Sequence, residues 1–425
     1  MRNSLKAIVL ASALSAAAIS PTSADAGSSH DYANQTTYGN AKDASIKSPP
    51  PGYSMYFLET LGRHGSRSQT SDSTEKRVLA VWQKAADKNA LTEGGKTFAR
   101  DVKLLQEAEK EIGYGKLSGV GKDEWTGIGR RNADNYEGFF ASIKKNKEKI
   151  SSVTTEVTRT KQSSDALRAS LTKELPSLDL AKHLATPTEA EAMMHLSNSA
   201  SSAGKGIINE IHARGALKNY ARTLLATLYS KSYVDSIKDP LDAALDVYKL
   251  YQTAPSMQEE TNITFARYVP SATREPLSYA TDVETFFKYG PGVKGETSSF
   301  SDAKPLLADF FKQLDNRIKG SSTAAVLRIA HGETTMPFAA LIKAPGSEVQ
   351  VPKGERFTRQ RNPWRGAVAG KMAGNIEWAA YRNTAKDVLI TMRYNEVPAK
   401  FHSGCKPYKS GSYFYTVAEI KRCLK

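Results

Sequence analysis

Strand-like segments gather near the two ends of the 425-residue chain, and this distribution limits its fold more than any other feature. Segments 53–60, 150–160, 323–335 and 387–396 contain apolar and β-branched runs, and the first and third of these end in polar loops. Between about 178 and 318, apolar residues recur at helical spacing instead. The pattern predicts an α/β sheet built from both ends of the chain, with a mainly α-helical domain inserted between them.

Helical spacing also occurs within the first part of the chain, at 75–89, 92–112 and about 126–145. Thr92 is a candidate N-cap, and Pro305 suits the first turn of a later helix. We therefore expect the following division: a signal peptide at 1–26, an N-terminal arm at 27–52, an α/β core at 53–177 and 319–425, and a helical insertion at 178–318.

The first 26 residues have the three parts of a secretory signal: a positively charged start, a short apolar region at 7–19, and the A-x-A site Ala24-Asp25-Ala26. The apolar region is shorter than the roughly 20 residues that span a bilayer, and no later run is long and charge-free enough to do so. We expect an exported protein, secreted or periplasmic, with no membrane span. A disordered N-terminus of a cytosolic protein is the alternative.

The formal net charge of +15 predicts an anionic partner. Nucleic acid, a membrane surface and a polyanionic small molecule are the three candidate classes. The basic residues are spread along the chain, and no RNA-binding motif or helix-turn-helix signature accompanies them. A nucleic-acid-binding protein is therefore the weaker alternative, and we expect a small anionic substrate and no nucleic acid.

Cys405 and Cys423 are the only cysteines. In an exported protein, an even and close pair indicates one disulfide, here fastening the last segment of the chain. Two free buried thiols are the alternative. His402 lies near Cys405, but one such pair is weak evidence for zinc, and we expect no metal site.

Charged and potentially nucleophilic side chains follow three of the expected strands. Because ligand groups in α/β proteins lie beyond the carboxyl ends of strands, these side chains should converge if the strands are neighbours. They are Arg63, His64 and Arg67 after the first strand, Arg159 at the end of the second, and His331 and Glu333 after the third.

This set of residue types suits phosphoryl chemistry. Arginines bind phosphoryl oxygens through paired N–H groups and stay charged at any working pH. Neighbouring cations also disfavour a protonated imidazole, so His64 should be neutral and able to attack phosphorus. Glu333, two residues after His331, is the nearest candidate acid for protonating a leaving alkoxide.

These segments resemble the histidine acid phosphatase family (histidine phosphatase branch 2). "RHGSR" at 63–67 matches the family's R-H-G-x-R motif, and 158–167 resembles the segment that carries a third arginine. "HGETTMPFAALI" at 331–342 and "NEVPAKFHSGC" at 395–405 resemble the multiple inositol polyphosphate phosphatases, a phytase-like branch. Two positions depart from the family pattern: Gln69 replaces a proline, and Gly332 replaces the alanine of His-Ala-Glu.

The resemblance implies a mixed central sheet flanked by helices, a phosphoglycerate mutase-like core, with an inserted helical domain. It also implies a metal-independent phosphomonoesterase that needs no cofactor and acts on phytate (inositol hexakisphosphate) and lower inositol phosphates. A general acid phosphatase acting on sugar phosphates or nucleotides is the alternative, and a monomer is expected. The implied roles are nucleophile for His64, proton donor for Glu333, and phosphate or substrate binding for Arg63, Arg67, Arg159, His331 and Lys76.

Three other histidines, His183, His195 and His212, lie in the helical block. The sequence shows no metal-ligand pattern around them, and we do not expect them at the site.

Overall fold

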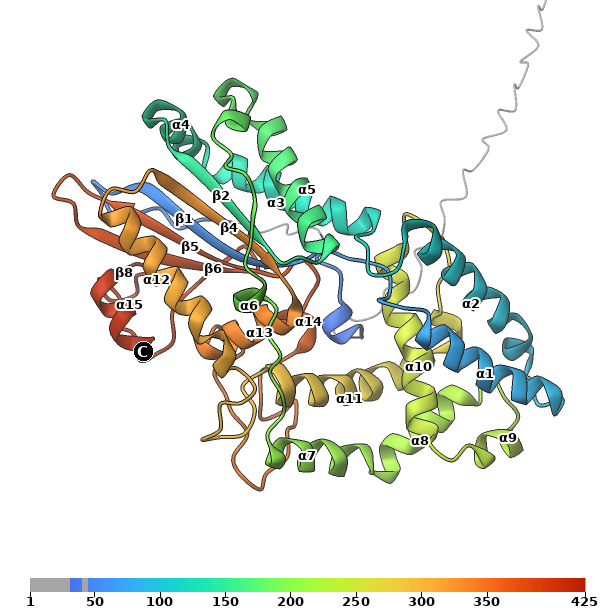
Figure 1. Ribbon diagram of the computed structural model, residues 1–425. Helices are drawn as coiled ribbons and strands as arrows, with labels where there is room; N and C mark the ends of the chain where they lie inside the picture. The colour runs from blue at the N-terminus through green and yellow to red at the C-terminus, as the bar shows by residue number, and fades with distance from the viewer. Residues whose placement is uncertain (1–30, 40–44, 425) are drawn as a thin grey trace, which may run out of the picture.

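The computed structural model describes residues 31–39 and 45–424. The expected signal peptide at 1–26 lies outside the described residues, as does part of the expected arm. In the described part of the chain, one eight-stranded sheet forms the centre of the molecule (Figure 1). Its strands are β1 (Ser54–Arg63), β2 (Lys149–Thr154), β3 (Thr188–Glu189), β4 (Thr323–Ala330), β5 (Asn375–Arg382), β6 (Val388–Tyr394), β7 (Val397–Ala399) and β8 (Tyr415–Thr416).

The sheet is mixed, with strand order β3-β2-β4-β1-β5-β6-β7 and with β8 paired to β6. The strands β1, β2, β3 and β4 pair in parallel. Strand β5 pairs with β1 in antiparallel fashion, and β6, β7 and β8 are also joined by antiparallel pairing. The carboxyl ends of β1, β2 and β4 therefore lie at one edge, side by side. This arrangement confirms the expected α/β fold with a mixed sheet.

Apolar side chains alternate along the central strands and bury both faces of the sheet. On β1, Leu58 packs with Trp125 and Ile128 on one side, whereas Phe57 packs with Phe310 on the other. The first face is covered by α3 (Gly119–Asn135), α4 (Glu137–Asn146) and α5 (Thr158–Glu174), and the second by α6 (Glu191–Met194), α12 (Lys304–Ile318), α13 (Gly332–Leu341) and α15 (Val417–Cys423).

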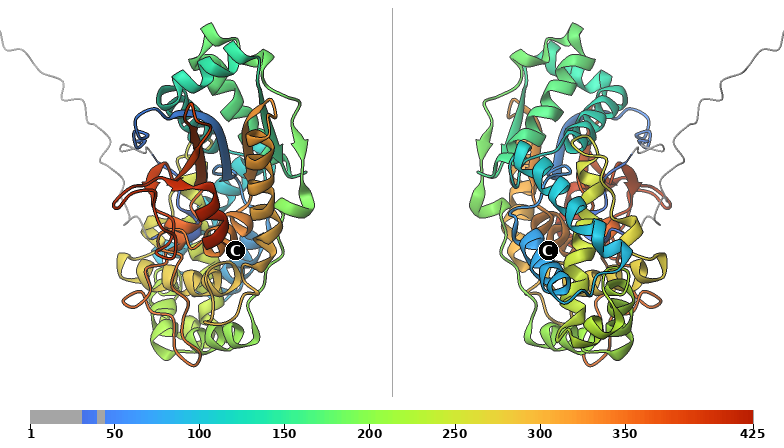
Figure 2. Two further views of the ribbon diagram at one scale, coloured as in Figure 1. Left: turned by 90° about the vertical axis from the view of Figure 1, so that its left-hand side faces the viewer. Right: turned by 90° about the vertical axis from the view of Figure 1, so that its right-hand side faces the viewer.

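A second, helical part lies beyond the carboxyl ends of the parallel strands (Figure 1). The views in Figure 2 show its green-to-yellow helices gathered at one end of the molecule. It contains α1 (Ser73–Asp87), α2 (Glu93–Ile112), α7 (Ser202–His212), α8 (Gly215–Leu225), α9 (Lys231–Ser236), α10 (Pro240–Thr253) and α11 (Ser271–Tyr289), while the short α14 (Gly366–Ala369) lies between the two parts.

The structure groups some helices differently from the expected division of the chain. Helices α1 and α2, placed by sequence with the α/β core, share a hydrophobic cluster with α8 and α10. Helix α12, placed in the insertion, packs on the sheet through Leu306, Phe310 and Leu314. The chain thus crosses between the two parts more often than one insertion requires.

Several local expectations can be compared directly. Thr92 caps α2 by accepting the Gly95 amide at 3.0 Å, and Pro305 lies in the first turn of α12, both as predicted. The strand expected over 150–160 is wrong in its second half, because β2 ends at Thr154 and α5 begins at Thr158. The single helix expected over 126–145 is divided at Tyr136.

Two further expectations concern the ends of the fold. Cys405 and Cys423 form the disulfide that the sequence predicts. Among the described residues, no helix combines the length and apolar character needed to cross a membrane.

Candidate active site

Strand β1 delivers His64 to the edge of the sheet with its ring almost fully buried. The backbone N–H of His64 donates to Ala330 at 2.9 Å, and that of Arg63 donates to Gly374 at 2.8 Å, so the loop is fixed to both sides. The His64 Nδ1 atom lies 2.9 Å from the Gly65 carbonyl oxygen. Because a carbonyl can only accept, Nδ1 carries the proton and Nε2 keeps its lone pair.

The surroundings of His64 hold it in this neutral form. Burial lowers the pKa of His64 well below its usual value, and the charges of Arg63, Arg159 and Arg67 lower it further. The sequence predicted the effect of the neighbouring cations, whereas the larger contribution comes from burial. An unprotonated Nε2 among positive charges is suited to attack an electrophile that carries negative charge.

The three predicted arginines surround this imidazole. Burial, followed by the charges of Arg159 and Arg63, lowers the pKa of Arg67 to about 9, which places the three guanidinium groups in one electrostatic cluster. The Nε–H groups of all three arginines are buried, and no residue in the described part of the chain accepts a hydrogen bond from them. Three convergent, unsatisfied donors with positive charge form a site for an oxyanion.

His331 lies at the N-cap of α13, fully buried beside His64, with ring centroids 5.6 Å apart. Its Nδ1 atom accepts from the Arg159 guanidinium at 3.2 Å, and Nε2 lies 2.9 Å from Thr155 Oγ1. Burial, followed by the charge of Arg159, lowers the pKa of His331 to about 3. Both ring nitrogens of His331 thus have a partner, one of which is Arg159, and its direct binding of phosphate stays a prediction.

Glu333 lies in the first turn of α13, two residues beyond His331, and its side chain is 32% exposed. Its charge raises the pKa values of Arg63, Arg67 and Arg159 against the effect of burial, which places the carboxylate next to the whole cluster. A carboxyl group near both solvent and the arginines can exchange a proton with a bound molecule.

Lys249 is a cation of this site that the sequence analysis missed. It lies on α10, and burial followed by the charges of Arg67 and Arg63 lowers its pKa to about 7. In the sequence, Lys249 is one lysine in an amphipathic helix, a pattern typical of a solvent-facing position. Only the packing of α10 against the catalytic loop distinguishes it.

Lys76, the predicted basic residue on α1, is placed differently. Its ammonium group pairs with Asp72 at 2.9 Å, and its side chain is 69% exposed. No contact among the described residues joins Lys76 to the three arginines of the site. The structure thus leaves Lys76 at the surface of the first turn of α1.

Two buried carboxylates hold the backbone of the loop that carries Arg67. Glu124 accepts hydrogen bonds from the Ser66 N–H and Oγ at 2.7 and 2.8 Å. Glu109 accepts from the Gln69 N–H at 2.7 Å. A proline at position 69 has no N–H to donate, so the residue that departs from the family motif makes a contact that the family residue would lack.

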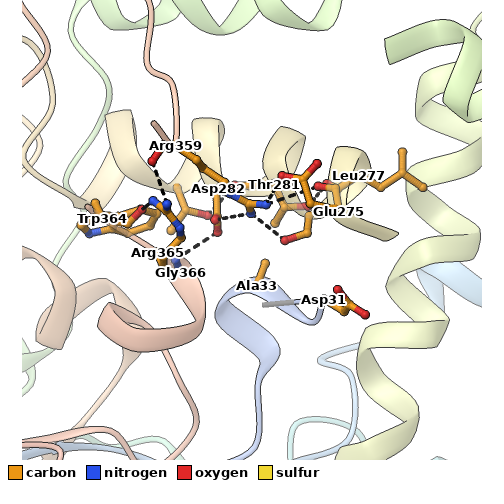
Figure 3. Close-up of polar contacts among 12 residues, drawn as sticks. Asp31, Ala33, Glu275, Leu277, Thr281, Asp282, Arg359, Trp364, Arg365 and Gly366 are labelled. Atoms are coloured by element: carbon orange, nitrogen blue, oxygen red, sulfur yellow. Dashed lines mark hydrogen bonds and ion pairs between the residues drawn. The ribbon is translucent and has the colours of Figure 1, made fainter. Parts of the chain in front are cut away.

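A polar cluster behind Arg63 holds the segment that contacts it (Figure 3). Arg359 donates to the buried Asp282 at 2.6 Å, and Asp282 accepts from the Gly366 N–H at 3.1 Å. Gly366 begins α14, and the next residue after that helix, Gly370, accepts a hydrogen bond from the Arg63 guanidinium. This chain of contacts ties the orientation of Arg63 to α11.

His195, which the sequence analysis set aside, also lies at the site. Its ring lies 4.4 Å from that of His331 between centroids, and its Nε2 atom is 4.0 Å from Glu333 Oε1. Its Nδ1 atom pairs with Glu191, four residues earlier. The Glu191–His195 spacing was a visible signal in the sequence, but nothing local related it to the end of β4 at Ala330, 135 residues further along the chain.

Comparisons with known proteins agree with this architecture. The family model of the histidine phosphatase superfamily (branch 2) matches residues 55–395. A multiple inositol polyphosphate phosphatase from Bifidobacterium longum, solved with inositol hexasulfate, is similar with a TM-score of 0.89 and 24% identity, over 93% of this chain and 97% of that one.

More distant structures share the fold. A phytase from D. castellii is similar with a TM-score of 0.69 and 12% identity, over 93% of this chain and 84% of that one. A Hafnia alvei phytase solved with myo-inositol hexakis sulphate has a TM-score of 0.52 and 10% identity, over 88% and 97%. The comparison with curated protein sequences gives no significant match.

Proposed function

The chain belongs to the histidine phosphatase superfamily (branch 2), and we propose that it is an exported phosphatase that hydrolyses inositol polyphosphates through a phosphohistidine. The observation that carries the proposal is the neutral His64, which lies among three arginines whose Nε–H groups are buried and have no acceptor in the described part of the chain. Such a site binds a phosphoryl group and presents a nucleophile to it.

In the first step, His64 Nε2 attacks phosphorus while the bond from phosphorus to the inositol oxygen breaks. Arg63, Arg67 and Arg159 bind the equatorial oxygens and stabilise the charge of the transition state. The carboxyl group of Glu333 gives its proton to the leaving oxygen. The products are the alcohol, a phosphohistidine and the Glu333 carboxylate.

In the second step, a water molecule attacks the phosphohistidine and transfers a proton to the Glu333 carboxylate. The bond from nitrogen to phosphorus breaks, inorganic phosphate leaves, and His64 returns to its neutral form. His331 keeps Arg159 oriented throughout, because its Nδ1 atom accepts the guanidinium hydrogen bond. All proton and electron transfers are supplied by protein side chains and water, so the proposal includes metal independence.

The choice of a polyphosphate rests on the charge of the site and of the chain. Lys249 adds a fourth positive group to the three arginines, and the chain carries a net charge of +15. A substrate with several phosphates places negative charge beyond the reacting group, where such cations attract it. A general acid phosphatase of sugar phosphates or nucleotides remains the competing proposal.

Export is proposed from the three-part pattern of the first 26 residues. The disulfide between Cys405 and Cys423 supports it, because such bonds persist in oxidising compartments.

The experiment is to incubate the purified mature protein with phytate, with and without EDTA, and to separate the products by ion exchange. We expect full activity in EDTA and a defined order of inositol phosphates. His64→Ala should release no phosphate while keeping the circular dichroism spectrum of the wild type, and turnover by this variant would refute the mechanism. Faster release from glucose 6-phosphate or AMP than from phytate would favour the competing proposal.

A further inference from the structure

The segment 190–195 brings a second histidine to the proposed proton donor. This segment follows β3 at the edge of the sheet and forms α6, and it is fastened to α13 by Thr334 Oγ1, which donates to the Met194 carbonyl at 2.6 Å. Because Thr334 follows Glu333 directly, the same turn of α13 carries both the proton donor and the anchor of α6. His195, at the end of α6, is thus held close to Glu333.

One nitrogen of His195 is fixed by a carboxylate. Glu191 Oε1 pairs with His195 Nδ1, and Glu191 Oε2 accepts the Glu156 backbone N–H at 2.8 Å. A carboxylate accepts, so Nδ1 carries a proton and the ring presents Nε2 on its other side. This is the arrangement by which a carboxylate orients an imidazole for work at its second nitrogen.

The second nitrogen faces Glu333. The distance of 4.0 Å from Nε2 to Glu333 Oε1 is longer than a hydrogen bond. Both side chains are about one third exposed, at 39% and 32%, so a small rotation of either closes the contact. The ring of His195 also packs against that of His331, with centroids 4.4 Å apart and an interplanar angle of 31°.

We propose that His195, held by Glu191, is a positioning residue for Glu333; this inference rests on the proposed function. When Glu333 is a carboxylic acid, the Nε2–H group of His195 donates to its Oε1 atom, and the acid proton on Oε2 stays available for the leaving group. When Glu333 is a carboxylate, the same N–H group donates to the same oxygen, so His195 neither gains nor loses a proton during the cycle. In both stages the carboxyl group stays directed at the leaving-group oxygen and then at the attacking water.

A substrate pair separates this role from a structural one. Hydrolysis of glycerol 2-phosphate expels an alkoxide and needs a proton donor, whereas p-nitrophenyl phosphate expels a stable phenolate and does not. If His195 acts through Glu333, His195→Ala lowers kcat on glycerol 2-phosphate about 10-fold or more, part of the roughly 10²- to 10⁴-fold that a general acid contributes. The same variant loses less than about threefold on p-nitrophenyl phosphate, with KM little changed.

Two further variants complete the test. Glu333→Gln should show the same dependence on the leaving group, and His195→Ala combined with Glu333→Gln should be no slower than Glu333→Gln alone. His212→Ala, which changes a half-buried histidine at the end of α7, serves as the matched control and should match the wild type on both substrates.

The outcomes are distinct. Equal losses of His195→Ala on both substrates, an unchanged kcat on both, or additive losses with Glu333→Gln would each overturn the positioning role. A wild type that releases phosphate neither from these two substrates nor from phytate would remove the proposed function itself, and this inference with it.

Discussion

Replacing Glu109 by glutamine should stabilise the protein at neutral pH and remove part of its pH dependence. Glu109 is fully buried, and its carboxylate accepts the Gln69 N–H at 2.7 Å. Glu75 is fully buried beside it, and neither Glu75 oxygen finds a donor among the described residues. Burial beside a second carboxylate disfavours the ionised form of Glu109, which therefore holds a proton in the folded protein.

The change in the free energy of unfolding can be calculated from the proton that Glu109 retains. Burial, followed by the neighbouring Glu75, raises the pKa of Glu109 from 4.5 to about 9. Above pH 4.5 the unfolded chain loses a proton that the folded pair retains, so the free energy of unfolding falls by about 1.4 kcal/mol per pH unit up to about pH 9. At pH 7 the retained proton costs at most on the order of 3 kcal/mol.

A glutamine at this position keeps an acceptor for the Gln69 N–H and adds an N–H donor toward Glu75. Urea unfolding followed by tryptophan fluorescence at pH 5 and pH 8 measures the outcome. The midpoint of Glu109→Gln should exceed that of the wild type at pH 8 and approach it at pH 5. Glu107→Gln, an exposed change on the same helix, is the control. An equal difference in urea midpoint between variant and wild type at both pH values would refute the reasoning, as would a lower midpoint of Glu109→Gln at pH 8.

Three other outcomes are expected. Arg328→Met removes a fully buried guanidinium that contacts Glu59 at 3.1 Å, so it should cost about 3–5 kcal/mol in urea unfolding; an unchanged midpoint would contradict this. Cys405→Ser with Cys423→Ser opens a crosslink of sequence separation 18, so it should cost about 3 kcal/mol and abolish the difference between reducing and non-reducing melts. Glu124→Ala removes the acceptor of the Ser66 N–H and hydroxyl groups, so the loop 63–67 should be misplaced and kcat should fall about 100-fold. A kcat of the variant equal to that of the wild type would contradict this.

The parts of the fold that the sequence predicts are those with local signals. Strand β1 is an apolar run that ends at a cluster of charged residues, and Thr92 caps α2 through a hydrogen bond within its own turn. The loop 63–67 needs no distant partner to be recognised, because its arginines and histidine are adjacent in the chain. Such signals predicted the ends of β1 and β4 and the residues that follow them, whereas the second strand ends at Thr154 and Arg159 lies on α5 instead of at a strand end.

The parts that were missed depend on distant partners. Strand β5 was not predicted, because Glu377 lies in the middle of it and a charged residue argues against a buried strand. In the structure, Glu377 pairs with Arg393 of β6 at 3.2 Å, which makes its burial tolerable. The β-branched run at 150–160 suggested a longer second strand, but the strand ends at Thr154. The next residue, Thr155, lies outside the sheet, and its hydroxyl group contacts His331.

The buried carboxylates near the arginines accept hydrogen bonds from the loop backbone, and this choice of partner leaves the guanidinium groups available for the proposed phosphoryl group. Glu124 and Glu109 accept N–H groups of Ser66 and Gln69, and in the described part of the chain the guanidinium Nε–H groups remain unpaired. A direct carboxylate–arginine pair would have to break before a phosphate could bind, which would weaken binding by the strength of that pair. The guanidinium groups instead repel one another: burial, followed by the charges of Arg159 and Arg63, lowers the pKa of Arg67. Binding of a dianion relieves that repulsion, so the same charges that disfavour folding of the free protein strengthen its hold on a phosphoryl group.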